Sequence, residues 1–469
     1  MRRREFLEKM AMSAVAVPCA ALADESYEGT VTGNGKPLRD VVVTDGLNCT
    51  LTDRNGRFSL AKRPLARFIS ITVPSGWRTV GAHYRPVAAG SFAFDLKPWK
   101  PSADKGCRFV QVADSETDAF AWLKALNAAA DRADAAFIVH TGDICRRGGM
   151  EAHAKNLTAE TTGRPVFYCI GNHDLEAGTY GEELFEILFG PCWYSFDAGG
   201  IHFIVTPMPN GDHKPSYTHE MVADWMRNDL AYVPKGRPVV VFNHMITYQW
   251  SSRDCGRKIG QGSAALDIAA NCNLAAFVHG HVHHSYFRRR QGVAHIATST
   301  PIKGGIGHDP ACFRIVRVAA DGKTTAQSVY YPVPDWTSIR AGANWETELG
   351  APVLCGEPVF AGDRLFLATL DDDGLGTGAV FALGAANGKV EAWGTFGDGV
   401  NFAGFGTHGA LRTKTLSGAV AGCWGAPYDC AVYPDDADFY ANVRAEEAHQ
   451  IRRLRDHPSI ALWCGDNEC

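Results

Sequence analysis

Five short apolar runs, each followed at once by a polar cluster, constrain the fold of this chain more than any other feature. The runs lie at 108–113, 136–140, 165–170, 238–242 and 274–278. Segments with helical spacing separate several of them, at 119–132, 218–230 and 263–271. Short runs that are apolar throughout are typical of strands buried on both faces. Strands of this kind alternating with helices predict an α/β fold, with an additional hairpin around Ala198-Gly199-Gly200.

The polar residues after these runs are carboxylates, amides and imidazoles. They are Asp114 and Glu116, Asp143, Asn172 with His173 and Asp174, His244, and His281 with His283. Open α/β sheets bind ligands beyond the carboxyl ends of their strands, so we expect these side chains to converge. Oxygen and imidazole ligands together suit Fe, Mn or Zn. Taken singly, a Gly-Asp pair is usually a turn, Asn-His-Asp a hydrogen-bonded loop, and a histidine-rich run an adventitious metal binder. Together, and in this order at the ends of five strands, these residues predict a metal centre.

The order D-x-x, GD, GNHD, NH and GHxH resembles the calcineurin-like metallophosphoesterases over residues 105–310. The resemblance implies a four-layer α/β/β/α sandwich with a dinuclear metal centre. It assigns Asp114 and His283 to the first metal and Asn172, His244 and His281 to the second, with Asp143 bridging the two ions. Two such ions activate water and hold the phosphoryl oxygens during in-line attack.

By the same resemblance, a metal-bridging hydroxide attacks the ester and His173 is the general acid that protonates the leaving oxygen. Asp174 either orients His173 or caps a helix. One position departs from the family: where it usually has His, and sometimes Gln, this chain has Glu116. A carboxylate there either ligates a hard metal, favouring Mn or Fe over Zn, or does not bind.

The segments before this domain predict export and a β-sandwich. Residues 1–23 combine Arg2-Arg3-Arg4, a mildly apolar stretch and Ala21-Leu22-Ala23, which is typical of a twin-arginine signal peptide cleaved before Asp24. A surface helix with a basic start is the alternative. Short strands divided by Gly, Asn and Asp turns over 26–98 predict a sandwich that resembles transthyretin-like or carboxypeptidase-regulatory-like modules. We therefore expect a periplasmic or extracellular protein.

The segments after the domain are β-rich at first and then change character. Residues 311–340 alternate apolar and polar positions, as in a closing strand or a small β appendage. Residues 341–425 resemble a blade of pyrroloquinoline-quinone-type propellers, which need about four blades or more to close. Residues 428–469 resemble the part of a β-mannosidase barrel that ends in its acid/base glutamate, here Glu468. Glycoside hydrolysis needs two carboxylates, and the strand that would carry the nucleophile has no counterpart here.

Composition narrows the functional classes. The net charge of −5 argues against a general nucleic-acid binder, and no apolar run approaches the roughly 20 residues of a membrane-spanning helix. The fourteen cysteines lack the CxxC pairs of a zinc site. Export permits disulfides, but several cysteines lie inside apolar strands, where buried free thiols are the commoner state.

The leading hypothesis is an exported phosphoesterase that hydrolyses a small-molecule or cell-envelope phosphate mono- or diester. The alternatives are a non-catalytic envelope binding protein built on a degenerate phosphoesterase, and a carbohydrate-active enzyme that uses Glu468. Loops 145–163 and 208–218 are expected to set the substrate, and no motif describes them. Oligomeric state is not encoded in any motif of the chain.

Overall fold

The computed structural model describes residues 25–103, 105–245, 272–281, 283, 285–290, 292–302, 311–330, 343–347, 359–369, 379–395, 441, 444–445 and 448. The predicted signal segment, the predicted helix at 263–271 and Glu468 lie outside the described residues.

The N-terminal part is a β-sandwich. One sheet has the order β2 (Lys36–Pro37), β1 (Ser26–Gly33), β9 (Phe92–Pro98), β7 (Trp77–Thr79), and β5 (Arg57–Ala61) also pairs with β1. The other has the order β4 (Cys49–Leu51), β3 (Val42–Thr44), β6 (Phe68–Ile71), β8 (Tyr84–Pro86). Every second side chain of β5 and β9 is buried, because alternate residues of a strand face opposite sides of the sheet. Two short 3-10 helices, η1 (Val87–Ala89) and η2 (Lys100–Ser102), flank β9.

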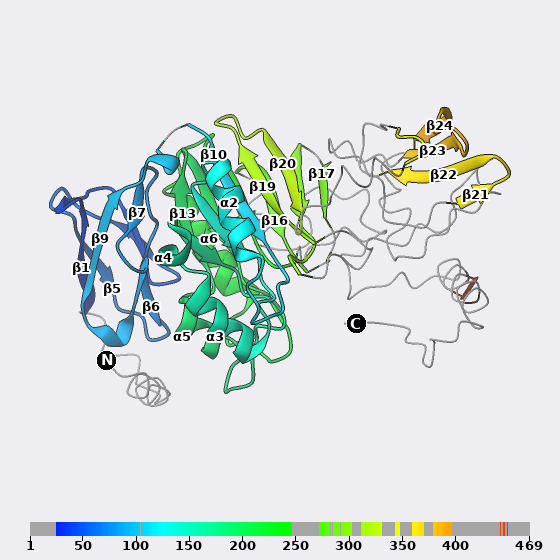
Figure 1. The fold of residues 1–469 in the computed structure, drawn as a ribbon. Coiled ribbons are helices and arrows are strands. Elements are labelled where there is room, and N and C mark those ends of the chain that lie inside the picture. The colour runs from blue at the N-terminus through cyan, green and yellow to red at the C-terminus, as the bar shows by residue number, and fades with distance from the viewer. Residues whose placement is uncertain are drawn as a thin grey trace.

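The following domain contains two further sheets (Figure 1). The first has the order β12 (Val166–Tyr168), β11 (Phe137–His140), β10 (Cys107–Val112), β19 (Cys312–Val318), β20 (Thr324–Tyr330). The second has the order β13 (Tyr194–Ala198), β14 (Ile201–Val205), β15 (Pro238–Phe242), β16 (Asn273–His279), β18 (Val293–Ala297), β17 (Tyr286–Arg290). Strands β10 to β12 are parallel, as are β14, β15, β16 and β18.

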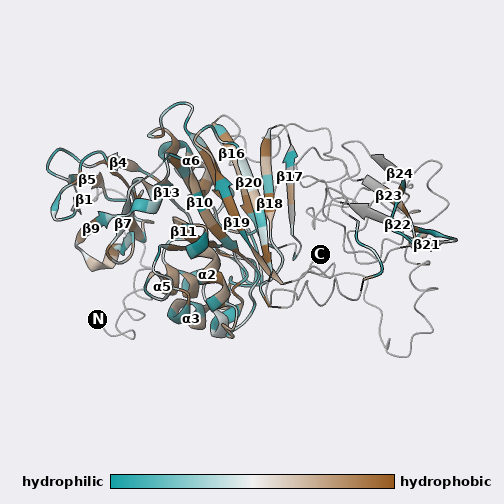
Figure 2. Cartoon of the chain, turned by 45° about the horizontal axis from the view of Figure 1, so that its top comes forward, coloured by the Kyte–Doolittle hydropathy of each residue, from teal (hydrophilic) through white to brown (hydrophobic). Residues whose placement is uncertain are grey.

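The two sheets pack face to face through aromatic rings. The ring centroid of Phe109 lies 4.9 Å from that of Phe137 in its own sheet and 5.3 Å from that of Phe242 in the other sheet. Much of β10, β16 and β18 carries the hydrophobic brown of Figure 2, whereas β17 and β20 are partly hydrophilic. Central strands such as β11 and β15 are buried along their whole length, which matches their nearly continuous apolar sequences.

Helices cover the outer faces and complete four layers. The first sheet contacts α2 (Leu123–Arg132), α3 (Arg146–Asn156) and α5 (Glu183–Phe189) through a second cluster of buried side chains, and the short α4 (Ala159–Thr162) follows α3. The second sheet is covered by α6 (His219–Leu230), whose Trp225 and Met226 pack on it. The fold class predicted from the sequence is confirmed.

Helices α2 and α6 differ slightly from the predicted ranges, for local reasons. Helix α2 begins at Leu123 instead of 119, because the hydroxyl of Thr117 accepts the backbone N–H of Ala119 in a tight turn. Helix α6 begins after Thr218, whose side chain accepts the N–H of Met221 as an N-cap.

Residues 311–330 belong to the first of these two sheets. Strand β19 runs antiparallel to β10 over five residue pairs, from Cys107 with Val318 to Gln111 with Arg314, and β20 pairs with β19. Of the two sequence-based alternatives, a closing strand or an appendage, the structure has the closing strand.

The sandwich packs directly against the β13 edge of the second sheet (Figure 1). Val73 of the sandwich forms a parallel bridge with Phe196, and Thr72 and Ser195 hydroxyls lie 2.9 Å apart. The indole N–H of Trp193 donates to the carbonyl of Gly46 at 3.0 Å. One continuous hydrophobic core therefore spans the sandwich and the two sheets.

The described C-terminal strands form a separate antiparallel sheet, β21 (Val359–Ala361), β22 (Arg364–Thr369), β23 (Ala379–Gly384) and β24 (Val390–Thr395). Four strands are what one propeller blade contains, but the likeness to a propeller protein stays a prediction. Among the helices of the described residues, none has the length and hydropathy needed to cross a membrane.

Candidate metal centre

The parallel strands deliver the predicted polar residues to one edge of the two sheets. Asp114 follows β10, Asp143 follows β11, and Asn172 follows β12. From the second sheet, His244 follows β15, and His281 with His283 follows β16. Ligand residues thus come from both sheets of the sandwich, as the carboxyl ends of neighbouring parallel strands require.

Two groups of ligand atoms meet there, and they share one residue. Asp143, His244 and His281 form one group, and Asp114, Asp143 and His283 form the other. Within each group the ligand atoms lie within 4.8 Å of one another. Asp143 is common to both, which is the position of a carboxylate that bridges two ions.

Individual distances show how tightly the site is built. His244 Nε2 lies 3.1 Å from Asp143 Oδ2 and 3.9 Å from Asp114 Oδ1. His283 Nε2 lies 3.4 Å from Asp114 Oδ1, and His281 Nδ1 lies 3.1 Å from the Asn172 side-chain oxygen. The side chains of Asp114, Asp143 and His244 are almost completely buried.

The orientation of His244 tests whether these residues suit a cation. Its Nδ1 lies 2.8 Å from the carbonyl of Thr141, so Nδ1 carries the proton in the neutral ring. The Nε2 lone pair then faces the carboxylates of Asp143 and Asp114, and this buried atom has no hydrogen bond of good geometry. A lone pair directed at carboxylates is unfavourable unless a cation lies between them, so the donor set fits a metal ion.

Electrostatics lead to the same conclusion. Burial disfavours the charged rings, but Asp143 raises the pKa of His244 to about 9 and Asp114 raises that of His283 to about 11. Burial also opposes ionisation of Asp143, yet the charges of His244, His173 and His281 lower its pKa. Without a metal, protons on the histidines compensate the carboxylates; metal binding would release those protons.

Backbone strain is concentrated at the same place. Ten non-glycine residues of the described chain have positive φ, and seven of them lie in the loops after β10, β11 and β16: Asp114, Glu116, Asp143, Cys145, Arg146, His281 and His283. Left-handed non-glycine residues cost about 1–3 kcal/mol each and cluster at functional sites.

Glycines let the backbone approach the ligands closely. A Cβ at Gly171 would lie 2.1 Å from Asp143 Oδ1, and one at Gly280 would lie 2.7 Å from Asp114 Oδ2. Any side chain at these positions would displace a carboxylate, which explains the glycines of the GNHD and GHxH motifs.

Glu116 lies beside the centre but in neither ligand group. Its Oε1 is 3.3 Å from His283 Nε2, and its side chain is 31% exposed. Glu116 therefore contacts the histidine of the first group from the solvent side, and its role as a ligand stays a prediction.

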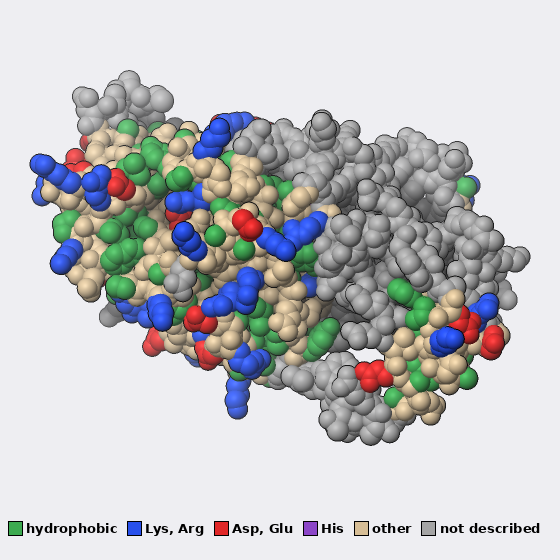
Figure 3. Space-filling model, turned by 90° about the horizontal axis from the view of Figure 1, so that it is seen from above, with side chains coloured by type: hydrophobic (Ala, Val, Ile, Leu, Met, Phe, Trp, Pro, Cys, Tyr) green, Lys and Arg blue, Asp and Glu red, His purple; other side chains and the backbone are tan. Residues whose placement is uncertain are grey.

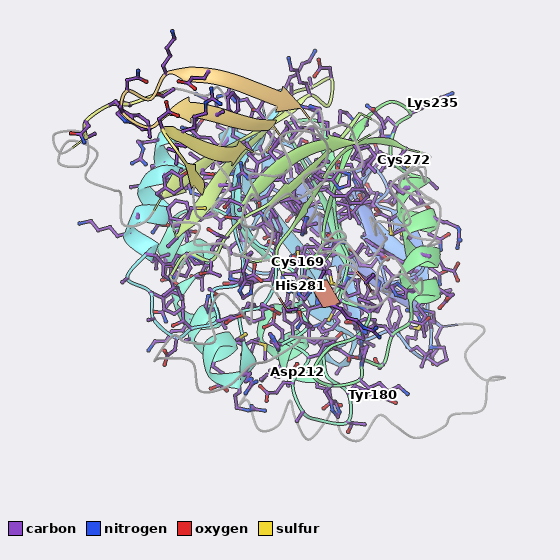
Figure 4. All side chains as sticks on the ribbon, turned by 90° about the vertical axis from the view of Figure 1, so that its right-hand side faces the viewer. Cys169, Tyr180, Asp212, Lys235, Cys272 and His281 are labelled. Atoms are coloured by element: carbon purple, nitrogen blue, oxygen red, sulfur yellow. The ribbon has the colours of Figure 1, made fainter. Side chains whose placement is uncertain are left out.

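His173 lies next to the ligands and points elsewhere. Its backbone N–H donates to Asp143 Oδ1 at 3.1 Å, while its ring Nδ1 lies 3.0 Å from both oxygens of Asp212. In Figure 4, Asp212 lies toward the lower edge of the view and His281 near its centre. The ring of His173 is thus placed between the buried ligands and the outer loop.

The predicted orienting role of Asp174 stays a prediction. The two Asp174 oxygens accept the backbone N–H groups of Cys145 and Gly171, at 2.9 and 2.8 Å, and so fix the loop that carries Asn172 and His173. Burial and the nearby charge of Asp143 raise the pKa of Asp174 to about 7. The carboxylate that faces the His173 ring is Asp212.

Asp212 was not predicted from the sequence, because its position depends on tertiary packing. The backbone N–H of Asp212 donates to the carbonyl of Asn172 at 3.0 Å. A Cβ at the preceding Gly211 would lie 2.3 Å from that same carbonyl oxygen. The Gly211-Asp212 pair was the available signal, but such pairs usually mark turns.

A buried hydrogen-bond network behind Asp114 was also missed. The Ser115 hydroxyl lies 2.9 Å from His140 Nε2 and 2.9 Å from His153 Nε2. Nδ1 of His153 faces the carbonyl of Gly149, so His153 Nε2 accepts the Ser115 proton and His140 Nε2 donates to Ser115. The network fixes Ser115, the residue that follows Asp114, and its members are too far apart in sequence to form a motif.

Comparison with known proteins identifies two segments of the chain. Residues 107–285 match the family described as calcineurin-like phosphoesterase, and residues 25–88 match the N-terminal region of calcineurin-like phosphoesterases. The second match covers most of the β-sandwich; a transthyretin-like relationship stays a prediction.

Solved structures with a similar fold include two phosphatases. A dimetal phosphatase from Danio rerio is 12% identical, covers 48% of this chain and 99% of its own, and has a TM-score of 0.32. A purple acid phosphatase from yellow lupin is 14% identical, covers 76% of this chain and 69% of its own, and has a TM-score of 0.30.

The curated relatives match only a short segment. β-Mannosidase of Bos taurus is 56% identical over 41 residues, which are 9% of this chain and 5% of the mannosidase. β-Mannosidase A of Aspergillus niger is 53% identical over 38 residues, which are 8% and 4% of the two chains. The chain thus spans a small fraction of the length of these relatives.

Proposed function

Starting from a chain that carries a calcineurin-like phosphoesterase domain, we propose that it hydrolyses a phosphate mono- or diester at a dinuclear centre. The observation that supports this most strongly is the shared carboxylate of Asp143. A single ligand group would bind one ion. Two groups that share one buried carboxylate are arranged to bind two neighbouring ions.

The residues divide into ligands and a proton donor. Asp114 and His283 would hold one ion, Asn172, His244 and His281 the other, and Asp143 both. Two ions held in this way make water a strong nucleophile and neutralise charge on the phosphoryl oxygens. The ligands position the ions, and no further base is needed from the chain.

His173 is the proposed general acid. Since its Nδ1 faces Asp212, the other ring nitrogen is the one that donates to the leaving oxygen. Asp212 holds the ring at the correct angle and stabilises its protonated form, as a carboxylate behind a catalytic histidine does. Asp212 is a positioning residue and does not contact the substrate.

Export is a further part of the proposal. The paired arginines, the mildly apolar stretch and the Ala-Leu-Ala site in residues 1–23 support it, and the described fold is compatible with a protein that folds and loads metal before crossing a membrane. The substrate would then be a phosphoester of the periplasm, the envelope or the medium.

Turnover of chromogenic phosphate mono- and diesters tests the proposed reaction. We expect the purified, metal-reconstituted chain to hydrolyse at least one class, and a chelator to abolish turnover until metal is restored. A protein that binds metal but turns over neither class would instead support the non-catalytic binding protein.

A further inference from the structure

A cavity with a volume of about 270 Å³ lies between the N-terminal sandwich and the phosphoesterase domain. None of the candidate metal ligands lines it. The sandwich contributes Trp77, Arg78 and His83 to its wall, and the phosphoesterase domain contributes Phe137, Phe167 and Tyr194. Interfaces between domains are common places for small-molecule sites.

The wall is strongly aromatic. The His83 ring lies 4.5 Å from the Tyr194 ring and 6.1 Å from the Phe167 ring, between centroids. Trp77 and Trp99 lie on the sandwich side. Surfaces of this kind favour a flat ring, which stacks on or packs edge-on to its neighbours.

Two buried nitrogens in this wall lack a hydrogen-bond partner among the described residues: Nε of Arg78 and Nε2 of His83. The Arg78 guanidinium is held in place, because Nη1 donates to the carbonyl of Gly163 at 3.1 Å and the group lies 4.4 Å over the ring of Trp99. Neither contact neutralises its charge, and Asp197, the carboxylate that lines the cavity, is paired with His202 and Arg237. Buried polar atoms normally have a partner, so these two nitrogens indicate one that is not part of the chain.

His83 is suited to donate beside Arg78. Burial lowers the pKa of its ring to about 4, with the charge of Arg85 acting in the same direction. The ring is therefore neutral at pH 7, and one of its nitrogens carries a proton. A ligand that accepts hydrogen bonds at two oxygens would satisfy both Arg78 and His83.

We propose that this interdomain cavity binds a small aromatic carboxylate. Its carboxylate accepts from Arg78 and His83, and its ring packs among Trp77, Phe167 and Tyr194. An engineered cavity of about 150 Å³ admits benzene, so the larger volume here suits one or two fused rings. Gly81, Ala82 and Ala159 line the cavity and are exposed, which places its opening at the surface near them.

The test is a titration of the full chain with 2-naphthoate, followed by calorimetry and by tryptophan fluorescence. We expect saturable binding of one equivalent. Arg78→Gln should weaken it about tenfold or more, the usual effect of losing a hydrogen bond to a charged group. The matched charge removal Arg57→Gln, on an exposed position of β5, should leave binding unchanged. 2-Naphthamide, the uncharged amide with the same ring system, should bind the wild-type protein as weakly as 2-naphthoate binds the Arg78→Gln variant.

Two controls locate the binding site. Ala159→Trp at the opening should abolish binding, whereas Glu160→Trp, the next residue on the surface, should not. Orthophosphate, which would occupy the metal centre, should not compete with 2-naphthoate. The proposal is overturned if folded wild-type protein shows no saturable binding at millimolar 2-naphthoate, if Arg78→Gln and Ala159→Trp bind like wild type, or if phosphate displaces the ligand.

Discussion

Asn172 and His173 are neighbours in sequence, yet their side chains face different partners. The side-chain oxygen of Asn172 lies beside His281 among the ligands, whereas the ring of His173 faces Asp212 in the outer loop. Successive residues leaving a strand point in different directions. One loop can therefore supply both a metal ligand and a proton donor.

Replacing His173 should separate these roles. We expect His173→Ala to keep both metal ions and to lower the rate by about 10²–10⁴. The loss should shrink for an ester with a good leaving group, because such an oxygen needs little protonation. Asp212→Asn should show the same leaving-group pattern with a smaller loss, about 10–100-fold. His244→Ala serves as the contrast and should lower metal occupancy instead.

Metal analysis alongside rates for a poor and a good leaving group distinguishes these outcomes. Loss of a metal ion in His173→Ala would refute the assignment, as would full activity of that variant on the poor leaving group.

At the scale of single residues, the sequence predicted those features of the site that follow from the order of the strands and from residue type. Residues at the ends of parallel strands must meet, so the placement of Asp143, His244 and His281 followed from where apolar runs end. Asp212 could not be predicted in the same way, since its partner lies 39 residues away and depends on the packing of a loop. For Asp174 the structure shows bonds to the backbone groups of Cys145 and Gly171, and its role in orienting His173 stays a prediction.

Among the elements, the β13–β14 hairpin is joined to helix α6 by a buried charge network. His202 Nδ1 lies 2.8 Å from Asp197, and its Nε2 lies 2.9 Å from Asp229 near the end of α6. Asp197 also pairs with Arg237 at 2.8 Å. Burial opposes protonation of His202, but Asp229 and Asp197 raise its pKa to about 9.

This network predicts a pH dependence of stability. An unfolded histidine has a pKa of about 6.5, so protonated His202 stabilises the fold fully below that value. The contribution, on the order of 3 kcal/mol, is lost as pH rises through about 9. Thermal unfolding of wild type and His202→Gln at pH 6.5 and pH 10 measures it. The variant should be clearly less stable at the lower pH and approach wild type at the higher one; an equal difference at both would count against this account.

For the whole molecule, a buried ion-pair cluster joins the sandwich to the phosphoesterase domain. Arg67 of the sandwich pairs with Glu182 at 2.8 Å and with Glu186 on α5 at 2.9 Å. Glu182 also bonds to Ser216, in the loop that carries Asp212. Burial raises the pKa of Glu186 to about 8, even though Arg67 opposes the shift. The sandwich therefore supports the loop that orients His173.

Removing Arg67 should leave Glu182 and Glu186 without a positively charged partner. We expect Arg67→Gln to lower the free energy of unfolding by about 3–5 kcal/mol, the usual cost of removing one member of a buried pair. Arg39→Gln is the control, since Arg39 pairs with Asp40 on the surface, and it should change stability little. Chemical denaturation measures both. If the two variants were equally stable, the cluster would not hold the domains together.

On the face shown in Figure 3, Lys, Arg, Asp and Glu are scattered among neutral side chains over the described part.

The α/β class was predictable from uninterrupted apolar strands. The role of 311–330 was left open, because the alternation of Phe313 to Val318 suits an edge strand and a separate hairpin equally.

Export makes a prediction for the intact protein. If residues 1–23 are a signal peptide, protein isolated from the native cell envelope should begin at or near Asp24. N-terminal sequencing or intact-mass analysis tests this, and an intact Met1 on envelope-associated protein would contradict it.

The number of metal ions per chain tests the dinuclear centre most directly. Elemental analysis after reconstitution and removal of loosely bound metal should give two transition-metal ions per chain, because Asp143 belongs to two ligand groups. Chelation should remove both ions together with activity. A metal content that never rises above one equivalent would contradict the dinuclear account.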